Sequence, residues 1–422
     1  TARWSVTGGR MDSVNVRATA TYGTKRRSFY DLLQSSLNMQ PARVDDYVEE
    51  PDGKKRAVPN VKETRLAQDK QKQIEAAFRD WIFKDPDRRR RLTAYYNEHY
   101  NNLRPREYDG SFLTFPGMNP EITLRPHQRN AVARILFGGN TLVAHAVGAG
   151  KTIVMGAAAM EKKRLGLCSK TMIVVPNHLT EQIGSELLTL YPNANILVAA
   201  KRDFEKDRRK LFCSRIATGN YDIVILGHSQ FTRLPLSDER QQQFLRDEIE
   251  QFTEVINAAK KERTGQELTV KQLERAKKSL ESRLEKLMDA PKDDAVTFEE
   301  LGVDSLMVDE AHQFKNLAVQ TKMQNVSGIT TAESRKATDL LMKCQYLDEI
   351  TGGKGVVFCT GTPISNSAAE LYTMMRYIQA DTLREHGLYA FDAWAANFGE
   401  TVSAMELAPE GTGYRMKTRF AR

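Results

Sequence analysis

The stretch TLVAHAVGAGKTIVMGAAAM, residues 141–160, decides the fold of the chain. A short apolar run leads into a glycine-containing turn, and an apolar, helix-forming run follows the turn. Glycines at such a turn let backbone N–H groups wrap around phosphate oxygens, and the helix behind points its positive end at the same anion. The stretch therefore predicts a nucleotide-binding strand–turn–helix unit, with a chance glycine-rich turn as the alternative. The residues that carry this prediction are Gly148, Gly150, Lys151 and Thr152.

The side chains after the last glycine supply the charge and the metal ligand that such a site requires. Lys151 would pair with the β- and γ-phosphates of a nucleoside triphosphate, and the Thr152 hydroxyl would complete the coordination of Mg²⁺. His145 stands where the usual GxxxxGK[ST] pattern opens with glycine. Because the closest phosphate contacts come from the later residues of the loop, we expect this departure to leave the site intact.

Further apolar runs continue the alternation of strands and helices along the chain. They read TMIVVP, NILVAA, YDIVILG, SLMVDEA and GVVFCTG, and helical stretches separate them. Near-continuous apolar strands that alternate with helices are typical of a parallel sheet covered on both faces. The pattern therefore predicts an α/β domain of the doubly wound type.

The run SLMVDEAH, residues 305–312, places two carboxylates at the end of an expected strand. Doubly wound sheets bind ligands at the carboxyl ends of their strands. Asp309 would hold Mg²⁺, directly or through water, and Glu310 would orient and deprotonate an attacking water. A simple cap at the strand end is the alternative, and the phosphate loop makes it less favoured.

Residues 1–118 have no obvious catalytic motif, and we expect them to form an α+β lead-in. VDDYVEEPDGKKRAV, residues 44–58, predicts a β-hairpin because a Pro-Asp-Gly turn joins two short extended runs. The spacing of Ile74, Phe78 and Ile82 predicts an amphipathic helix after the hairpin.

Four consecutive arginines, Arg88–Arg91, follow Asp85-Pro86-Asp87, which has the composition of a helix start. Such a run could contact phosphate. More often it is the solvated face of a helix, and this is the interpretation that we favour from the sequence.

Residues 238–290 interrupt the strand–helix pattern with two highly charged helical segments. FLRDEIEQFTEVINAA carries its apolar side chains on one stripe, and TVKQLERAKKSLESRLEKLM repeats leucine at heptad-like spacing. We expect an antiparallel helical hairpin inserted into the α/β domain. A DNA-contacting arm, a docking site for a partner and a structural spacer are all open as its role.

The composition of the 422 residues, 41% hydrophobic and 27% charged, is ordinary for a soluble globular protein. No apolar run is long enough to span a bilayer, and TARWSVTGGR at the start lacks the apolar core of a secretory signal. The four cysteines form no CxxC pair, which favours a reducing cytoplasm and argues against a zinc site. A net charge of +8 suits a polyanionic partner without requiring one.

The motifs together resemble the DEAH-type motor domains of superfamily 2 helicases and translocases. GKT and DEAH carry this resemblance, and DEAHQFKN with TGTPISNSAAELY narrows it to the Swi2/Snf2-like branch. LRPHQRNAVARIL resembles the opening motif of that branch, while VVPNHLTEQ and ILGHSQF stand where its DNA-contacting motifs belong. The resemblance implies a RecA-like lobe of a P-loop nucleoside triphosphatase that binds ATP and Mg²⁺ and acts on double-stranded DNA.

The resemblance also implies roles for particular residues. It assigns the adenine edge to Gln128, coupling between the ATP site and DNA to His312, Thr360 and Thr362, and contacts with the DNA backbone to Asn177, His178, Ser229 and Lys315. Residues 119–400 would form the first RecA-like lobe, and 401–422 would begin a linker to a second lobe. Motors of this superfamily take arginines of the ATP site from the second lobe. We therefore expect ATP hydrolysis in a parent protein and weak or no hydrolysis by this chain alone.

A narrower resemblance covers most of the chain. REYDGSFLTFPGMNPEITLRPHQ, TFEELGVD and APEGTGYR are similar to the helicase segment of large proteins of bacterial conjugative elements and phages, which fuse a DNA adenine methyltransferase to a Snf2-like motor. This sequence lacks the [DNS]PP[YFW] tetrapeptide of such methyltransferases, so methylation would belong to the parent. The implied function is an ATP-driven translocase within a DNA modification or anti-restriction protein. The alternatives are a catalytically silent DNA- or protein-binding module that retains the ATP fold, and a restriction-type translocase subunit.

Overall fold

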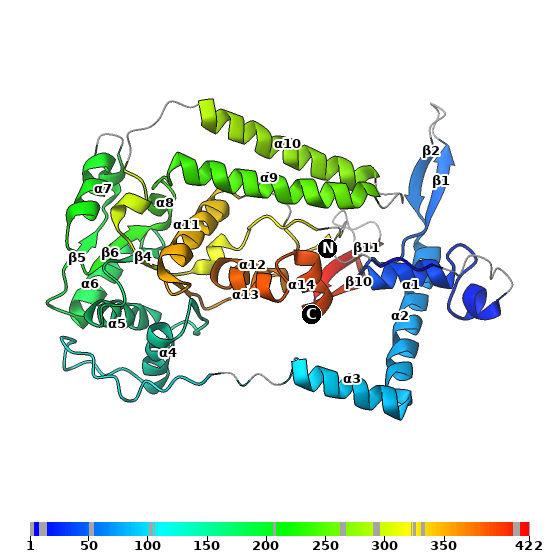
Figure 1. Ribbon diagram of the computed structural model, residues 1–422, viewed down its shortest axis with the longest axis horizontal. Coiled ribbons are helices and arrows are strands. Elements are labelled where there is room, and N and C mark those ends of the chain that lie inside the picture. Colours follow the sequence, from blue (N-terminus) through cyan, green and yellow to red (C-terminus); the bar gives the residue numbers. More distant parts are fainter. Residues whose placement is uncertain are drawn as a thin grey trace. The chain divides into compact units, whose positions relative to one another are not determined.

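The computed structural model describes residues 4–7, 15–49, 55–99, 101, 104, 106–205, 208–261, 267–289, 296–321, 323, 326–330, 334–407 and 414–421. They form two compact units, whose elements Figure 1 labels. The larger unit comprises Glu107–Gln320 and Thr330–Tyr389, and the smaller comprises Thr1–Arg106, Thr321–Ile329 and Ala390–Arg422. This division differs from the predicted ranges 1–118, 119–400 and 401–422, because the segment after Tyr389 packs with the N-terminal residues.

The larger unit contains a six-stranded sheet in the order β3-β9-β7-β4-β6-β5, and all five neighbouring pairs are parallel. Every residue of β4, β6, β7 and β9 is buried, as expected for strands covered on both faces. The predicted α/β, doubly wound fold class is therefore confirmed. The strands are β3 Thr141–Val143, β4 Thr171–Val175, β5 Ile196–Val198, β6 Ile223–Gly227, β7 Ser305–Val308 and β9 Val356–Cys359.

Alternate residues of the central strands enter two separate hydrophobic clusters, one on each face of the sheet. Along β4, Met172 and Val174 belong to one cluster, while Ile173 and Val175 belong to the other. This is the period of two that a pleated strand imposes. The first face is covered by α7 Arg209–Thr218, α8 His228–Phe231, α11 Arg335–Thr351 and α12 Ala369–Ile378, and the second by α4 Pro126–Phe137, α5 Lys151–Arg164 and α6 Thr180–Leu190.

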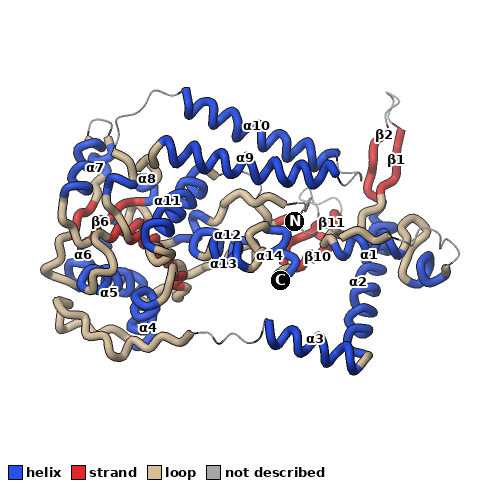
Figure 2. The backbone as a smooth tube through the Cα atoms, viewed as in Figure 1, coloured by secondary structure: helices blue, strands red, loops and turns tan. Residues whose placement is uncertain are grey.

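The predicted inserted hairpin consists of two long helices, α9 Asp238–Lys261 and α10 Glu267–Asp289, which lie side by side (Figure 2). Leu245 and Ile256 on the apolar stripe of α9 are buried. An ion pair joins α9 to α11, with 2.9 Å between the Arg240 guanidinium and the Glu349 carboxylate. Among the helices of the described ranges, none is both long enough and apolar enough to cross a membrane.

The N-terminal part of the smaller unit contains the predicted β-hairpin and helices. β1 Asp45–Glu49 pairs in antiparallel register with β2 Lys55–Pro59, and the expected turn between them lies outside the described residues. α1 Phe29–Leu37 begins at a capping box made by Ser28 and Asp31. The predicted amphipathic helix is α2 Val61–Lys84, and α3 Pro86–His99 follows it.

The C-terminal part of the smaller unit contributes to a second sheet. β10 Glu400–Leu407 and β11 Tyr414–Ala421 pair in antiparallel register, and β11 also pairs with β8 Val326–Ser327. α14 Phe391–Phe398 packs on this sheet through Trp394, whose ring centroid lies 6.3 Å from that of Phe420. Residues 401–422, which we expected to begin a linker, thus include the strands of a β-hairpin.

A fully buried lysine connects two helices on one face of the large sheet. Lys343 on α11 donates to Asp339 Oδ2 at 2.7 Å and to the carbonyl oxygen of Phe231, at the end of α8, at 2.9 Å. Its ammonium also lies 4.1 Å from the centroid of the Phe231 ring. Burial lowers the pKa of Lys343, and Asp339 opposes that change. The lysine therefore fixes α8 relative to α11.

We expect Lys343→Ala to lower the free energy of unfolding by about 3–5 kcal/mol, because it leaves the Asp339 carboxylate buried without its cation. Urea denaturation at neutral pH measures this loss. The double variant Lys343→Met with Asp339→Leu removes both charges together and should lose much less stability than the single variant. Equal losses in the two variants would contradict the role of the ion pair.

Candidate nucleotide site at the carboxyl edge of the sheet

The loop between β3 and α5 is the predicted phosphate loop. Gly148 and Gly150 adopt φ angles of 82° and 80°, in the left-handed region that disfavours residues with a side chain. At Gly150 an added Cβ would also lie 2.3 Å from Gln128 Nε2, so that position has no room for a side chain. Gly150 directly precedes Lys151, the first residue of α5. The unpaired N–H groups of the first helical turn therefore follow the loop, as anion binding requires.

Lys151 supplies a positive charge at this loop. Lys151 Nζ lies 3.3 Å from the carbonyl oxygen of His145, so the ammonium lies over the loop. The ring of His145 contacts the ring of His127 edge to face, with centroids 5.3 Å apart. Burial, with the nearby His127 and Lys151 charges, lowers the pKa of His145. His145 is therefore neutral at pH 7 and does not add to the charge of Lys151.

Gln128 and His127, at the start of α4, hold the loop in place. Gln128 is buried, donates from Nε2 to the carbonyl oxygen of Ala149 at 3.0 Å, and accepts from the backbone N–H of Arg125 at 2.8 Å. His127 Nε2 lies 3.1 Å from the same Ala149 oxygen. The structure thus gives Gln128 a supporting role for the loop, and its contact with an adenine edge stays a prediction.

A cavity of about 410 Å³ lies beside the loop, between α4 and β3. Tyr108, His127, Arg134 and His145 are among the residues that line it. Arg134 stacks over the Tyr108 ring, with 5.2 Å from its guanidinium carbon to the ring centroid. The cavity therefore combines aromatic and cationic groups next to the candidate phosphate site.

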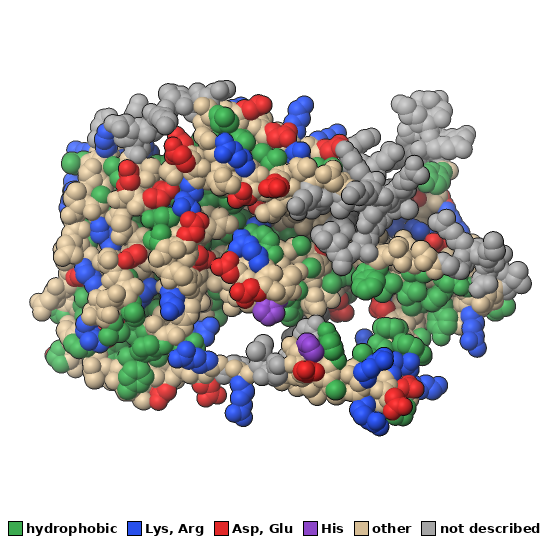
Figure 3. Space-filling view, in the orientation of Figure 1, with side chains coloured by type: hydrophobic (Ala, Val, Ile, Leu, Met, Phe, Trp, Pro, Cys, Tyr) green, Lys and Arg blue, Asp and Glu red, His purple; other side chains and the backbone are tan. Residues whose placement is uncertain are grey.

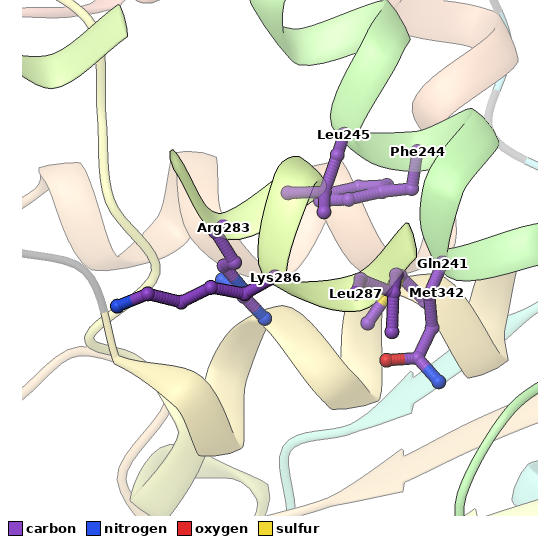
Figure 4. Close-up of a pocket in the computed structure, with 7 residues that line it drawn as sticks. All are labelled: Gln241, Phe244, Leu245, Arg283, Lys286, Leu287 and Met342. Carbon is purple, nitrogen blue, oxygen red and sulfur yellow. The ribbon is translucent and has the colours of Figure 1, made fainter. Parts of the chain in front are cut away.

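A second cavity, of about 250 Å³, lies where the inserted hairpin meets α11 (Figure 4). Phe244 and Leu245 from α9 and Leu287 from α10 form its apolar wall with Met342 from α11, and Arg283 and Lys286 extend to one side. The three helices that line this cavity, α9, α10 and α11, carry none of the predicted site residues. We assign this cavity to the packing of the hairpin.

Asp309 and Glu310 directly follow β7, which pairs with β9, the neighbour of the loop strand β3. Asp309 is buried, and its backbone N–H donates to the carbonyl oxygen of Val174 at 2.8 Å. Its Oδ1 atom is buried and has no hydrogen-bond partner among the described residues. Burial raises the pKa of Asp309, while the Lys151 charge opposes this rise. The strand order therefore brings the lysine of the loop and this carboxylate to the same edge of the sheet.

Glu310 is held in a strained conformation. Its φ of 50° and ψ of 46° lie in the left-handed region, which costs a residue with a side chain roughly 1–2 kcal/mol. Its carboxylate Oε2 lies 3.1 Å from His312 Nδ1. Such strain is concentrated at functional sites, where it directs a side chain. Here it directs the Glu310 carboxylate to His312.

The predicted coupling residues meet at one buried hydroxyl. Thr360 Oγ1 lies 3.0 Å from His312 Nδ1 and accepts from the backbone N–H of Thr362 at 3.1 Å. The backbone N–H of Thr360 donates to the carbonyl oxygen of Val143, the last residue of β3, at 3.2 Å. Thr360 therefore connects the segments after β3, β7 and β9.

The predicted DNA-contacting residues of two strand-end loops also lie together. Asn177 follows β4, and its Oδ1 accepts from the backbone N–H and the hydroxyl of Ser229, both at 3.0 Å. At Gly227 an added Cβ would lie 2.5 Å from the same Asn177 oxygen, so a side chain there would displace the Asn177 amide from Ser229. His178 is exposed beside Asn177.

His228 joins these loops to the candidate ATP site, and the predicted site did not include it. It is buried, with Nε2 2.9 Å from the carbonyl oxygen of Asp309 and Nδ1 2.9 Å from Gln313 Oε1. Burial lowers its pKa. The signal that could have found it is its place in ILGHSQF, directly after a wholly apolar strand.

Lys315 lies in an ion pair rather than on open surface. Its Nζ lies 2.9 Å from Glu370 Oε1, and it also donates to the Ser365 hydroxyl. Burial favours the neutral form of Glu370, but hydrogen bonds from Ser365 and Lys315 outweigh it, so the pKa of Glu370 is lowered. The pair holds the segment before α12 in place, and the contact of Lys315 with DNA stays a prediction.

A doubly wound sheet with these loops at the carboxyl ends of its strands defines a RecA-like α/β domain of the helicase-like class. Residues 135–421 match the family described as a probable helicase domain, and this chain belongs to that family. Residues 1–102 match a second family, described as a domain of unknown function (DUF8437).

Two individual proteins are similar to parts of the chain. "Defense against restriction protein B" of Escherichia phage P1 is 24% identical over 369 residues, which are 78% of this chain and 16% of that protein. The chain therefore spans less than a fifth of the length of this relative. The solved structure of the Sulfolobus solfataricus SWI2/SNF2 ATPase core in complex with dsDNA is 15% identical, with a TM-score of 0.38, over 68% of this chain and 41% of that chain.

We expect Asp309→Asn to stabilise the chain in the absence of ligand. The folded state raises the pKa of Asp309, so the charged carboxylate present at pH 7 costs stability, and an amide removes that cost. A gain of about 1 kcal/mol would raise the melting temperature by about 2 °C. The gain should shrink as the pH falls through the raised pKa of Asp309, because the wild-type carboxylate then takes up a proton in the folded state. A variant that melts below wild type at pH 7 would contradict this account.

Proposed function

We propose that the chain is the ATP-binding motor lobe of an ATP-dependent double-stranded DNA translocase. The observation that carries the proposal is the strand order β3-β9-β7, which brings the loop before α5 and the buried Asp309 Oδ1, an oxygen with no hydrogen-bond partner among the described residues, to one edge of the sheet. An isolated buried carboxylate is costly, and a bound cation offsets that cost. Membership of the probable helicase domain family supports the same function.

The residues at this edge fit ATP with Mg²⁺. Asp309 Oδ1 and the Thr152 hydroxyl would hold the metal ion, as oxygen ligands suit magnesium. When bound, Mg²⁺ neutralises charge that develops on the phosphates during transfer. Lys151 would pair with the β- and γ-phosphates, and Glu310 would take a proton from the attacking water. His312, within 3.1 Å of Glu310, would orient that carboxylate.

The loops after β4 and β6 are proposed to bind duplex DNA through its backbone. Asn177, His178 and Ser229 are exposed polar residues on neighbouring strand ends, and they carry groups that donate to phosphate oxygens. His228 lies between these loops and the Asp309 backbone. A movement of the DNA-contacting loops would therefore be transmitted through the His228 side chain to Asp309 and Glu310. We infer that Thr360 and Thr362 pass such a change to the phosphate loop.

The chain is proposed to act as part of a larger anti-restriction or DNA modification protein in the cytoplasm. The relative from phage P1 is named for defence against restriction, and this chain spans 16% of it. A second RecA-like lobe and a fused methyltransferase are the partners that the sequence resemblance implies. Their presence in a parent protein is testable from its full sequence and from assays on it.

We expect Lys151→Ala to abolish ATP binding, because the phosphates lose their direct cation. We expect Glu310→Gln to retain binding and to slow hydrolysis by the full-length parent about 10²–10⁴-fold, the size of a general-base contribution. Isothermal titration calorimetry and a steady-state ATPase assay measure the two effects. Lys354→Ala, which removes an exposed lysine of the same unit, is the control. Equal ATP affinity of Lys151→Ala and wild type would reject the site.

Binding of duplex DNA should weaken steeply with salt and should not depend on sequence, because the proposed contacts are to phosphates. Asn177→Ala removes the acceptor that positions Ser229, and it should lower duplex affinity severalfold. Fluorescence anisotropy with two unrelated duplexes of equal length tests both points. Salt-insensitive binding, or a strong preference for one duplex, would count against backbone contacts.

A further inference from the structure

The turn between α2 and α3 presents large aromatic side chains to solvent. Phe78, Trp81 and Phe83 on α2 are 56%, 52% and 53% exposed. No residue of α3, all of which the structure describes, is buried. Aromatic side chains are usually covered, and a group of exposed ones marks an interaction surface. We call the three aromatic residues together with Arg88–Arg91 the aromatic–arginine surface.

Hydrogen bonds and stacking hold this surface in a defined shape. The Asp85 carboxylate accepts from the backbone N–H of Arg88 at 2.7 Å and so caps the start of α3. The Arg88 guanidinium donates to the carbonyl oxygen of Trp81 at 2.7 Å and lies 3.6 Å from the Trp81 ring centroid. The Phe78 and Trp81 rings stack with centroids 5.8 Å apart and planes at 22°. Three planar groups are therefore already stacked before any partner binds.

The arginines that follow are positioned for a polyanion. Arg89, Arg90 and Arg91 are exposed, and the 3.4 Å contact of Arg90 with Asp87 joins two side chains that are 80% and 90% exposed. Such an exposed pair contributes little, so the arginine charges are available to a partner. Figure 3 shows Lys and Arg side chains gathered over the turn, with hydrophobic side chains of α2 beside them. The surface thus combines positive charge with exposed rings.

The spacing of the arginines distinguishes between polyanions. Consecutive helical residues lie about 100° apart, so Arg88–Arg91 spread around the α3 axis instead of forming one polar face. A helix that lies on a membrane separates an apolar face from a basic face, and α3 does not. A nucleic-acid strand offers phosphates in several directions and also offers flat bases to the rings. In a duplex the bases stack on each other, so the rings would lack a partner there.

We propose that the aromatic–arginine surface binds single-stranded nucleic acid. Arg89, Arg90 and Arg91 pair with phosphates, and bases stack on the Phe78–Trp81–Arg88 group. The sequence favoured a solvated helix face for these arginines, and the exposed rings beside them are what changes that interpretation. This site goes beyond the proposed function, because it lies in the smaller unit and requires no ATP.

The test uses the whole chain and fluorescence anisotropy with a labelled oligothymidine of about 15 nucleotides, near the upper site size of single-strand binders. Arg89→Gln with Arg90→Gln and Arg91→Gln should lower affinity at least 10-fold and reduce the slope of log affinity against log salt by about 2. Phe78→Ala should lower affinity at least fivefold and leave that slope unchanged, because it removes stacking only. Thermal melting confirms that each variant folds.

The matched control is Lys25→Gln with Lys62→Gln and Arg65→Gln, which removes three exposed charges from the same unit. It should change affinity less than twofold. Wild-type affinity of the Arg89–Arg91 triple variant, or a loss no larger than that of the control, would overturn the proposal. Capture of the chain by phosphatidylserine vesicles but not by oligothymidine would overturn it in favour of a membrane.

The test of single-strand binding can fail or succeed independently of the proposed ATP site. Lys151→Ala should bind oligothymidine as wild type does, and Asn177→Ala should lose affinity for duplex DNA only. If Asn177→Ala weakens single-strand binding as much as the Arg89–Arg91 variant does, the single strand binds at the sheet edge and the proposal fails.

Discussion

The Asp309 carboxylate is buried directly after β7, and its Oδ1 atom has no hydrogen-bond partner among the described residues. Burial of this charge is unfavourable, and the functional edge of the larger unit depends on keeping it there. Burial disfavours its charge, and the backbone N–H of Glu310 opposes this effect, with a smaller contribution from the Lys151 charge. Lys151 and Asp309 come to the same edge of the sheet because β3 and β7 both lie beside β9. The backbone of Asp309 is fixed on one side by Val174 and on the other by His228. The costly position of this carboxylate is thus maintained by contacts with β4 and α8, both distant from Asp309 in sequence.

Much of this arrangement could be predicted from the sequence, because apolar strands and a GKT turn are local signals. The parallel sheet, the phosphate loop and the Asp309–Glu310 pair all follow from patterns a few residues long. The engagement of Lys315 with Glu370 could not be predicted in this way, because the two residues are distant in sequence and only the fold brings them together. Gln128 illustrates the same limit: the family resemblance implies that it reads the adenine edge, while in the structure it donates to the Ala149 carbonyl oxygen.

The two family matches agree with the packing of the chain at one boundary and differ from it elsewhere. The domain of unknown function ends at residue 102, and the smaller unit includes residues up to Arg106. The helicase match begins at residue 135, within α4, although Gln128 and His127 at the start of that helix hold the phosphate loop. The match also extends to residue 421, through strands that pack in the smaller unit. The structural units and the families therefore overlap without coinciding.

The strand order has a consequence for how the protein is made. β3, which leads into the phosphate loop, is an edge strand in the described sheet and pairs only with β9 there. Its first residue, Thr141, is opposite Val357, so the partner strand leaves the ribosome long after the loop itself. Closing so long a segment is slow, and the inserted hairpin of α9 and α10 can form locally while the remaining strands are awaited. The strand that leads into the phosphate loop therefore stays unpaired until almost the whole unit has been synthesised, whereas Gln128 and His127, which hold the loop itself, are made shortly before it.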